Sequence, residues 1–305
     1  MPELILHHYP MSPFSEKARG MLGLKRLSWH SVHMPSLMPK PDVQALTGGY
    51  RRAPLLQVGA DIYCDTALIA DVLEHLAPTP ALYPPGHKGL ARALAQWADG
   101  TLFWAAMAYG APAAVAGLPP ATAQAFAADR AHMGLSTTLA APDAAAACRS
   151  YLRRIAEMLA HGPWLLGDAP SVADFAACHP LWFIRGVDGA RGVLDATPAV
   201  VQWMDRVAAL GHGTSVPMTG QQAIDVARAA TPASLLTDSG FQDEHGIPLG
   251  SRVSVRAESF GLEETTGELV AASRTHYSLR RSDPRAGEVQ VHFPRIGYVL
   301  TRADG

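Results

Sequence analysis

Two short stretches of this chain carry polar groups that could act together on a small anionic ligand. The first begins at Ser12, which precedes Pro13 and a helical pattern running to about Leu27. Serine at the cap and proline at the first position are typical of a helix start. Capping is therefore one interpretation of Ser12. The other is chemical, because a hydroxyl at the positive end of a helix dipole can donate to a thiolate and lower the thiol pKa.

The second stretch ends at Asp65-Thr66, directly before an apolar-periodic helix over residues 67–76. Ala53-Pro54 opens its first apolar run, and a turn at Gly59 leads to a second β-favouring run. Proline cannot donate to a sheet ladder, so Pro54 at the first residue of a strand would tolerate a cis bond and an exposed backbone edge. An edge N–H at Ala53 beside the helix start at Asp65-Thr66 predicts a small site for a peptide-like anion.

Three motifs together resemble the glutathione transferase family. Ser-Pro-Phe-Ser-Glu-Lys-Ala-Arg, starting at Ser12, is similar to the first-helix signature of serine-type members. Ala-Pro-Leu-Leu from Ala53, followed by Asp65-Thr66, is similar to the glutathione-site half of their thioredoxin-like domain. Leu-Leu-Gly-Asp-x-Pro-Ser-Val-Ala-Asp-Phe from Leu165 resembles the folding motif of their all-helical domain, where Ser-Val-Ala-Asp is a structural capping box. The resemblance covers about residues 3–210.

The resemblance implies a role for each residue of the two polar stretches. Ser12 would stabilise the glutathione thiolate and be the catalytic residue. Ala53 and Pro54 would form the cis-proline loop that pairs with the cysteinyl backbone of glutathione, and Asp65 and Thr66 would hold its γ-glutamyl end. Glutathione would therefore be the co-substrate, with no metal ion.

The remaining site candidates depend on looser matches. In the family, basic or amide residues meet the glycyl carboxylate, which makes Arg52 and Lys40 the candidates here. The run over residues 47–52 departs from the usual Asn-Pro-x-Gly-Lys pattern, so solvated surface charge is the alternative for both. An acceptor pocket would lie between the two domains, although such side chains are more often plain core. Its candidates are Phe14, Trp104, Met107 and Tyr109.

The number and spacing of the cysteines argue against disulfide, zinc and dithiol redox chemistry. Cys64, Cys148 and Cys178 are an odd number with no Cys-x-x-Cys, which argues against a disulfide scaffold or a zinc ribbon and fits a reducing cytoplasm. Ser15 stands where a redox relative would carry its second cysteine, so dithiol chemistry is excluded and deglutathionylation is disfavoured. We expect Cys64 to be a buried strand cysteine.

The length, net charge and composition of the chain limit the classes of partner that it could bind. At 305 residues the chain suits two or three domains, and a net charge of −2 provides no field for nucleic acid or an acidic membrane. The thirteen histidines form no metal pattern. The N-terminal residues lack a signal-peptide pattern. Residues 100–128 carry no charge, but Gly and Pro interrupt them, which favours a buried helix and a loop over a membrane span.

The periodicity predicts three domains. Residues 1–78 form an α/β domain, which the resemblance implies is thioredoxin-like, followed by a Pro/Gly-rich linker. Residues 88–213 form an all-α domain, whose expected helices cover 88–109, 120–133, 144–161, 171–185 and 197–210. Residues 214–235 are a linker with a short helix over 221–230. Period-two patterns then predict five strands in a small all-β, barrel-like domain over 236–305.

The sequence thus predicts a glutathione transferase-like enzyme that activates the glutathione thiolate for attack on a small electrophile. A cytoplasmic homodimer is expected from the resemblance, although the added β-domain could remodel that interface. A glutathione-dependent isomerase fits the same residues. A sensor of a glutathione-like ligand, or a protein-interaction scaffold without turnover, is the alternative from another class. The acids and arginines of residues 241–305 nearly balance, nine against eight, which weakens a nucleic-acid role for the β-domain.

Overall fold

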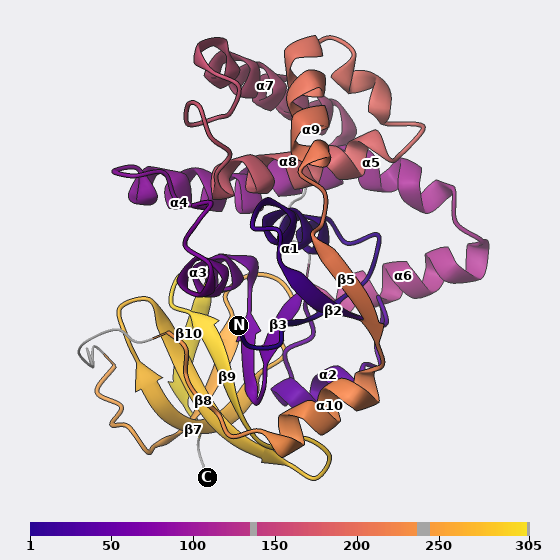
Figure 1. Ribbon diagram of the computed structural model, residues 1–305. Helices are drawn as coiled ribbons and strands as arrows, with labels where there is room; N and C mark the ends of the chain where they lie inside the picture. Colours follow the sequence, from indigo (N-terminus) through magenta and orange to yellow (C-terminus); the bar gives the residue numbers. More distant parts are fainter. Residues whose placement is uncertain (135–138, 237–244, 304–305) are drawn as a thin grey trace.

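The computed structural model describes residues 1–134, 139–236 and 245–303, which form a sheet-based half and a helical half (Figure 1). The two halves meet across the helices that cover the upper face of the sheet in this view. Residues 237–244 and 304–305 of the expected β-domain lie outside the described residues.

The first part of the chain forms the expected thioredoxin-like α/β unit. Its elements are β1 (Ile5–His8), α1 (Pro13–Leu24), β2 (Ser28–His33), α2 (Pro41–Thr47), β3 (Leu55–Val58), β4 (Asp61–Cys64) and α3 (Thr66–Leu76). Strand β1 pairs in parallel with β2 and antiparallel with β3, and β3 pairs antiparallel with β4. Strands β1, β3 and β4 are buried along their whole length because helices cover both faces of the sheet.

The helical half also follows the sequence pattern. Its elements are α4 (Lys88–Trp97), α5 (Phe103–Ala116), α6 (Pro120–Met133), α7 (Ala141–Met158), α8 (Val172–Arg185) and α9 (Pro198–Ala209), with short 3₁₀ turns at Leu159–His161 and Arg191–Leu194. The helix expected over residues 88–109 is divided by a π-helical turn, Ala98–Leu102. Such turns often mark functional sites.

The folding motif of the helical half is confirmed as structural. The Asp174 carboxylate is fully buried and accepts from the Ser171 backbone N–H and hydroxyl, each at 2.9 Å. Its other oxygen accepts from the Leu165 N–H and from the Trp203 indole N–H, also at 2.9 Å. Burial raises the pKa of Asp174. One carboxylate therefore joins the start of α8 to the preceding loop and to α9.

The C-terminal region differs in organisation from the separate domain that its pattern suggested. All five expected strands are present as β6 (Arg252–Ala257), β7 (Thr265–Ala272), β8 (His276–Asp283), β9 (Gly287–Pro294) and β10 (Tyr298–Arg302). The expected linker holds β5 (Thr214–Met218) and α10 (Gly220–Ala229). Strand β5 pairs in parallel with β2, and β9 pairs in parallel with β4. The six added strands, β5 and β6–β10, therefore extend the sheet of the first unit at both edges.

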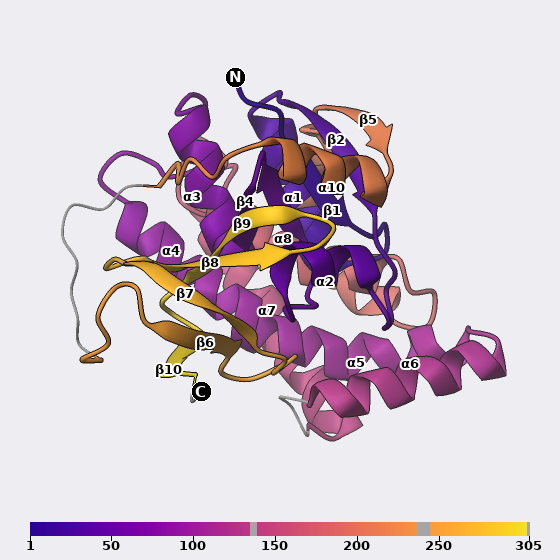
Figure 2. The ribbon, with the colours of Figure 1, turned by 90° about the horizontal axis from the view of Figure 1, so that it is seen from below.

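The result is one open sheet of ten strands within the described residues, in the order β10-β6-β7-β8-β9-β4-β3-β1-β2-β5. Viewed from below, α10 and α2 lie side by side, and the C-terminal strands turn away from the rest of the sheet (Figure 2). Ile224 of α10, Ile62 of β4 and Val291 of β9 share one hydrophobic cluster. The C-terminal region and the thioredoxin-like unit thus have a common core.

A buried polar cluster fastens β9 to β4. The Asp61 carboxylate lies 2.8 Å from His292 Nε2 and also accepts from the backbone N–H groups of Ala233 and Ser234. The other ring nitrogen of His292 lies 2.8 Å from the Ser278 hydroxyl. The His292 ring stacks on Tyr63, with 4.5 Å between ring centroids. Asp61, Ser278 and His292 are each about 1% exposed, so this chain of hydrogen bonds is sealed from any substrate.

No helix of the described residues is both long enough and apolar enough to cross a membrane. The uncharged stretch over residues 100–128 contains the end of the π-helical turn, α5 and the start of α6.

We predict that Asp61→Ala destabilises the protein by about 2–5 kcal/mol, because it leaves several buried donors without an acceptor. Urea unfolding measures the change. Asp188, whose side chain is 91% exposed in an ion pair with Arg191, provides the control. Asp188→Ala should cost at most about 1 kcal/mol. Equal losses in the two variants would show that Asp61 does not anchor β9.

Candidate active site

The sheet register places the two polar stretches at one end of the sheet. Leu55 is paired with His7 on one side and with Cys64 on the other. Pro54, which precedes Leu55, therefore lies beside Asp65, which follows Cys64. The loop after β1 leads from the same end of the sheet to Ser12. The structure thus brings Ser12, Ala53–Pro54 and Asp65–Thr66 to neighbouring positions.

Ser12 is the N-cap of α1, as its sequence position predicts. Its hydroxyl oxygen accepts from the Ser15 backbone N–H at 3.2 Å, and its side chain is almost fully buried. Accepting this bond leaves the hydroxyl hydrogen available for donation to a ligand. The positive end of α1 lies at the same place, so a negative charge near Ser12 is favoured. Ser15 is fully buried, and its hydroxyl has no hydrogen-bond partner among the described residues.

The cis-proline loop and the acidic cap have the expected local geometry. The Ala53–Pro54 peptide is cis, and Pro54 directly precedes β3. Asp65 caps α3 by accepting from the Ala67 N–H at 2.9 Å. Its backbone has a φ of 74°, which is uncommon for a residue with a side chain. Backbone strain of this kind occurs at sites where the surrounding structure fixes a functional residue.

Thr66 belongs to a buried network that joins the two halves of the molecule. Lys17 on α1 is about 1% exposed, and its ammonium donates to the Thr66 hydroxyl at 3.0 Å and to Asp99 in the π-helical turn. The second oxygen of Asp99 lies 3.0 Å from His179 Nε2 on α8. Burial by itself raises the pKa of Asp99, but Lys17 and His179 lower it below its ordinary value. Burial lowers the pKa of His179.

Arg52 is positioned to bind an anion. Its Nε and Nη2 atoms are buried and have no hydrogen-bond partner among the described residues. Burial alone would lower the pKa of Arg52, but Tyr298, Tyr50 and Asp65 raise it above its ordinary value. Arg52 is therefore a partly buried cation, and two of its buried donor atoms, Nε and Nη2, could serve an anionic ligand.

Lys40 is engaged within the protein. Its ammonium donates to the Arg51 carbonyl at 2.9 Å, and its side chain is nearly buried. Burial and the nearby Arg51 and Arg130 lower the pKa of Lys40 to about 8. The neighbouring Arg51 pairs with Asp129 on α6 and with Glu263. A ligand role for Lys40 would require it to leave the Arg51 carbonyl, so Arg52 is the better placed of the two basic candidates.

Two of the four acceptor-pocket candidates have aromatic contacts between elements. The Phe14 ring centroid lies 4.7 Å from that of Phe103 and 4.6 Å from that of His179. Phe14 of α1 therefore packs against the helical half. The ring centroid of Trp104 lies 5.0 Å from that of Phe260 in the C-terminal region. Met107 and Tyr109 are partly buried and pack against the larger hydrophobic core, which fits the alternative of plain core residues.

The comparisons with known proteins address the family. The N-terminal domain model of glutathione S-transferase matches residues 6–81, and the C-terminal domain model matches residues 112–206. A solved GST-like protein from Pseudomonas syringae is 41% identical, with 99% of this chain and all of that chain covered and a TM-score of 0.83. This chain belongs to the glutathione S-transferase superfamily.

Two further relatives match a smaller share of the chain. A glutathione S-transferase structure from Rhodospirillum rubrum is 21% identical over 68% of this chain and 88% of that chain, with a TM-score of 0.52, a likeness of fold. FtsZ-localized protein A from Caulobacter vibrioides is 26% identical over 186 residues, which are 57% of this chain and 74% of the relative. The C-terminal strands are therefore an addition to the transferase fold that the Pseudomonas syringae protein shares.

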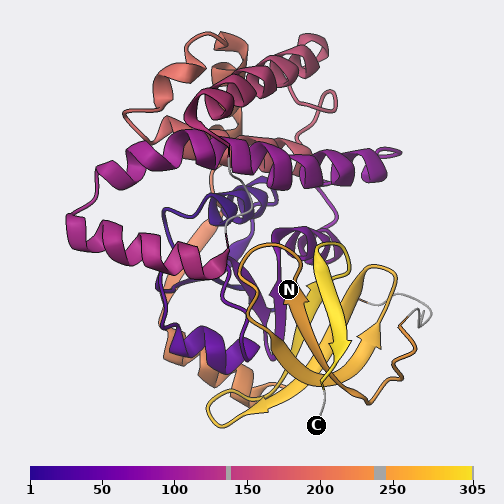
Figure 3. The same cartoon turned by 180° about the vertical axis from the view of Figure 1, so that it is seen from behind.

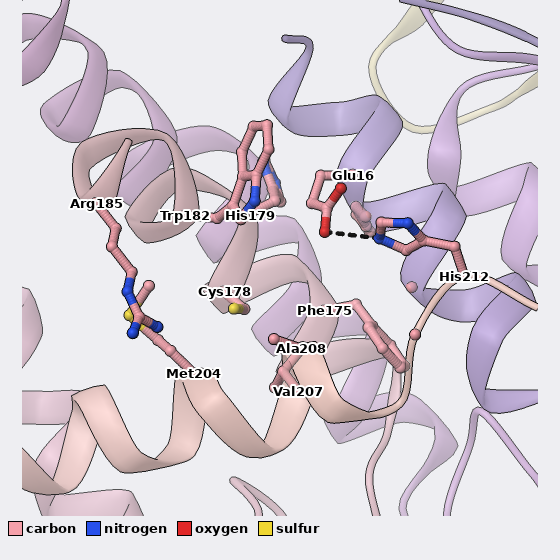
Figure 4. Close-up of a pocket in the computed structure, with 13 residues that line it drawn as sticks. Glu16, Phe175, Cys178, His179, Trp182, Arg185, Met204, Val207, Ala208 and His212 are labelled. Carbon is pink, nitrogen blue, oxygen red and sulfur yellow. Dashed lines mark hydrogen bonds and ion pairs between the residues drawn. The ribbon is translucent and has the colours of Figure 1, made fainter. Parts of the chain in front are cut away.

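Among these transferase elements, a small cavity of about 50 Å³ lies between α1, α8 and α9 (Figure 4). Glu16 and His212 are joined across its edge at 2.9 Å, and Cys178 and Trp182 are among its lining residues. Burial raises the pKa of the Cys178 thiol, which opposes nucleophilic chemistry. Neither Ser12 nor the cis-proline loop lines this cavity, and a tripeptide does not fit in it.

Sequence reasoning missed several residues that lie around the candidate site. Lys17 is part of the first-helix motif, but a lysine on a helix is normally solvated, and only its packing shows that it is buried. Asp99 and His179 had no recognisable spacing. Tyr298 and Phe260 belong to the C-terminal region, whose position depends on long-range strand pairing. Cys64 is fully buried in β4, as expected, and burial raises its thiol pKa well above the ordinary value.

We predict that Lys17→Met destabilises the protein by about 3–5 kcal/mol, because it leaves the Asp99 carboxylate in the interior without its ammonium partner. Chemical denaturation measures the loss. The double variant Lys17→Met/Asp99→Leu should lose less than Lys17→Met alone, since no uncompensated charge remains. A single-variant loss below about 1 kcal/mol, the size expected for a surface pair, would contradict the network.

Proposed function

We propose that this protein is a glutathione transferase-like enzyme of the serine type. It activates the glutathione thiolate for attack on a small electrophile. The observation that carries this proposal is the position of Ser12 at the positive end of α1, at the same end of the sheet as cis-Pro54 and the Asp65–Thr66 cap. Family membership supports it.

In the proposed complex, the cysteinyl backbone of glutathione pairs with the backbone at Ala53. Its γ-glutamyl end lies at the start of α3, where the Asp65 carboxylate binds the ammonium group. Thr66, held by Lys17, presents its hydroxyl beside the helix N-terminus for the γ-glutamyl carboxylate. The glycyl carboxylate binds Arg52, whose unpartnered donors it would satisfy.

The chemistry requires the sulfur as a thiolate near neutral pH. The Ser12 hydroxyl donates a hydrogen bond to the sulfur, and the α1 dipole adds to the stabilisation of its negative charge, so the thiol pKa falls. The thiolate then forms a bond to the electrophilic carbon, and the displaced electron pair moves to a leaving group or to an electron-withdrawing substituent. A glutathione-dependent isomerase would use the same activated thiolate.

We predict that Ser12→Ala lowers kcat/KM with a model electrophile about 10- to 100-fold, the size expected for a hydrogen bond to a charged sulfur. Ser12 also caps α1, and losing a cap costs about 1 kcal/mol of stability. Thr219→Ala removes an equivalent cap from α10, away from the cleft, and should leave kcat/KM unchanged. Full turnover in Ser12→Ala would refute the serine-type mechanism.

We further predict that glutathione at one hundred times its dissociation constant stabilises the native protein by about 2.7 kcal/mol, seen as a rise in Tm. Asp65→Asn should greatly reduce the rise, since it removes the charge that binds the ammonium but keeps a capping oxygen. Asp225→Asn, at an exposed position of α10, is the matched control and should retain the shift. Absence of any shift in the wild-type protein would reject glutathione as the ligand.

A protein-interaction scaffold or ligand sensor is the second candidate function. The similarity to FtsZ-localized protein A, whose name describes an association with another protein, favours it. So does the engagement of Asp65 by Tyr298 and of Thr66 by Lys17 within the chain itself. The glutathione melt separates the enzyme from a scaffold, which shows no rise in Tm, and a ligand sensor would show the rise without turnover of an electrophile.

A further inference from the structure

The C-terminal region reaches the proposed glutathione site at two places. The first is Tyr298 at the start of β10, which is 4% exposed. Its hydroxyl lies 3.1 Å from Asp65 Oδ2 and 3.2 Å from the Tyr50 hydroxyl. A phenol has one hydrogen, and of its two neighbours the carboxylate is the stronger acceptor, so Tyr298 donates to Asp65. This hydrogen bond fixes one oxygen of the Asp65 carboxylate.

The second place is the connection between β6 and β7, residues 258–264, which we name the covering segment. Phe260 contacts Trp104 of α5, and the Gly261 N–H donates to the Met133 carbonyl at the end of α6 at 2.9 Å. Glu263 pairs with Arg51 at 3.0 Å. The segment therefore extends from the sheet to the helical half. Seen from behind, α6 descends toward the sheet-based half and the C-terminal strands lie beside it (Figure 3).

The covering segment and Tyr298 surround Arg52. The guanidinium carbon lies 5.9 Å from the Phe260 ring and 6.0 Å from the Tyr298 ring. A side chain on Gly261 would begin only 3.4 Å from Arg52 Nε. The two buried atoms without partners, Nε and Nη2, form one edge of the guanidinium. Their N–H bonds run parallel, which is the geometry that holds both oxygens of a carboxylate.

A ligand reaches this edge only if a covering element moves. Tyr298 is held by strand β10, and both Tyr50 and Tyr298 are held by core packing and by their contact with each other. Residues 258–264 lie between two strands and outside the sheet ladder. The covering segment lies outside the strand ladders, so its displacement would open this edge without breaking a strand pairing. It contacts Trp104, where the electrophile of the proposed reaction would lie.

We propose that the C-terminal region is part of the ligand site: Tyr298 is a positioning residue for Asp65, and Phe260 is a specificity-determining residue for the electrophile. This inference rests on the proposed glutathione function. It assigns to the added strands a direct role in substrate binding, with the carboxylate of the ligand on Arg52 beneath the covering segment.

The role of Tyr298 is tested by Tyr298→Phe. We expect the dissociation constant and KM for glutathione to rise about tenfold, as when a hydrogen bond to a charged group is lost, with kcat at saturating glutathione unchanged. Tyr277→Phe removes the hydroxyl of another buried tyrosine, on β8, and should alter neither constant. A purely structural role of the Tyr298 hydroxyl would lower the Tm of Tyr298→Phe without this split between KM and kcat.

The role of Phe260 is tested by Phe260→Ala with a small and a bulky electrophile. We expect kcat/KM for the bulky electrophile to rise severalfold relative to the small one, because the wall opposite Trp104 is removed. Leu262→Ala alters the same segment at a side chain that is 44% exposed, and its ratio should equal that of the wild type.

The outcomes separate this inference from the proposed function. Wild-type protein that neither binds glutathione nor turns over electrophiles would overturn both. Wild-type binding and turnover, with Tyr298→Phe and Phe260→Ala both equal to the wild type, would overturn only the role of the C-terminal region. The expected changes in both variants would establish it.

Discussion

The parallel pairing of β9 with β4 is the constraint on which the arrangement of the candidate site depends. It fixes the register Ile62 to Val291, and the Asp61–His292 contact prevents slippage, because a shift by one residue would separate these buried polar partners. From β9 onward, antiparallel neighbours place β8, β7, β6 and β10 in turn. The position of Tyr298 beside Asp65, and of the covering segment over Arg52, follows from this single pairing.

A second constraint joins the two transferase domains. Lys17 is buried where two helical layers meet, and an ammonium in that environment is tolerated only with a carboxylate and further hydrogen bonds. Asp99 provides the carboxylate from a π-helical turn, and Thr66 provides a hydroxyl from the start of α3. The relative position of the helical half and the ligand site is therefore determined by charge pairing as well as by apolar packing. This explains why a lysine lies within the first-helix motif.

The candidate site combines polar groups that already have hydrogen-bond partners with one, Arg52, whose Nε and Nη2 have none among the described residues. Asp65 and Thr66 each have a partner from elsewhere in the chain, which orients them before any ligand arrives. Arg52 keeps a buried edge without hydrogen bonds, a costly arrangement that a carboxylate ligand would relieve. In a binding site, such preorganisation lowers the cost of ordering side chains around the ligand. In a protein that did not bind this ligand, the same contacts would occlude the candidate site.

The sequence by itself determined the local elements and the family. Apolar periodicity placed the helices from 120 to 210 and all five C-terminal strands, and Ser12, Asp65 and Ser171 marked helix starts through short-range capping chemistry. Tertiary structure alone decided that these strands extend the first sheet, that the expected linker becomes β5 and α10, and that Lys17 is buried. The reason is physical: periodicity reports which face of a segment is apolar, whereas the choice of partner strand depends on contacts between residues far apart in the chain. Tyr298 carries no local signal of the Asp65 carboxylate that it meets 233 positions away.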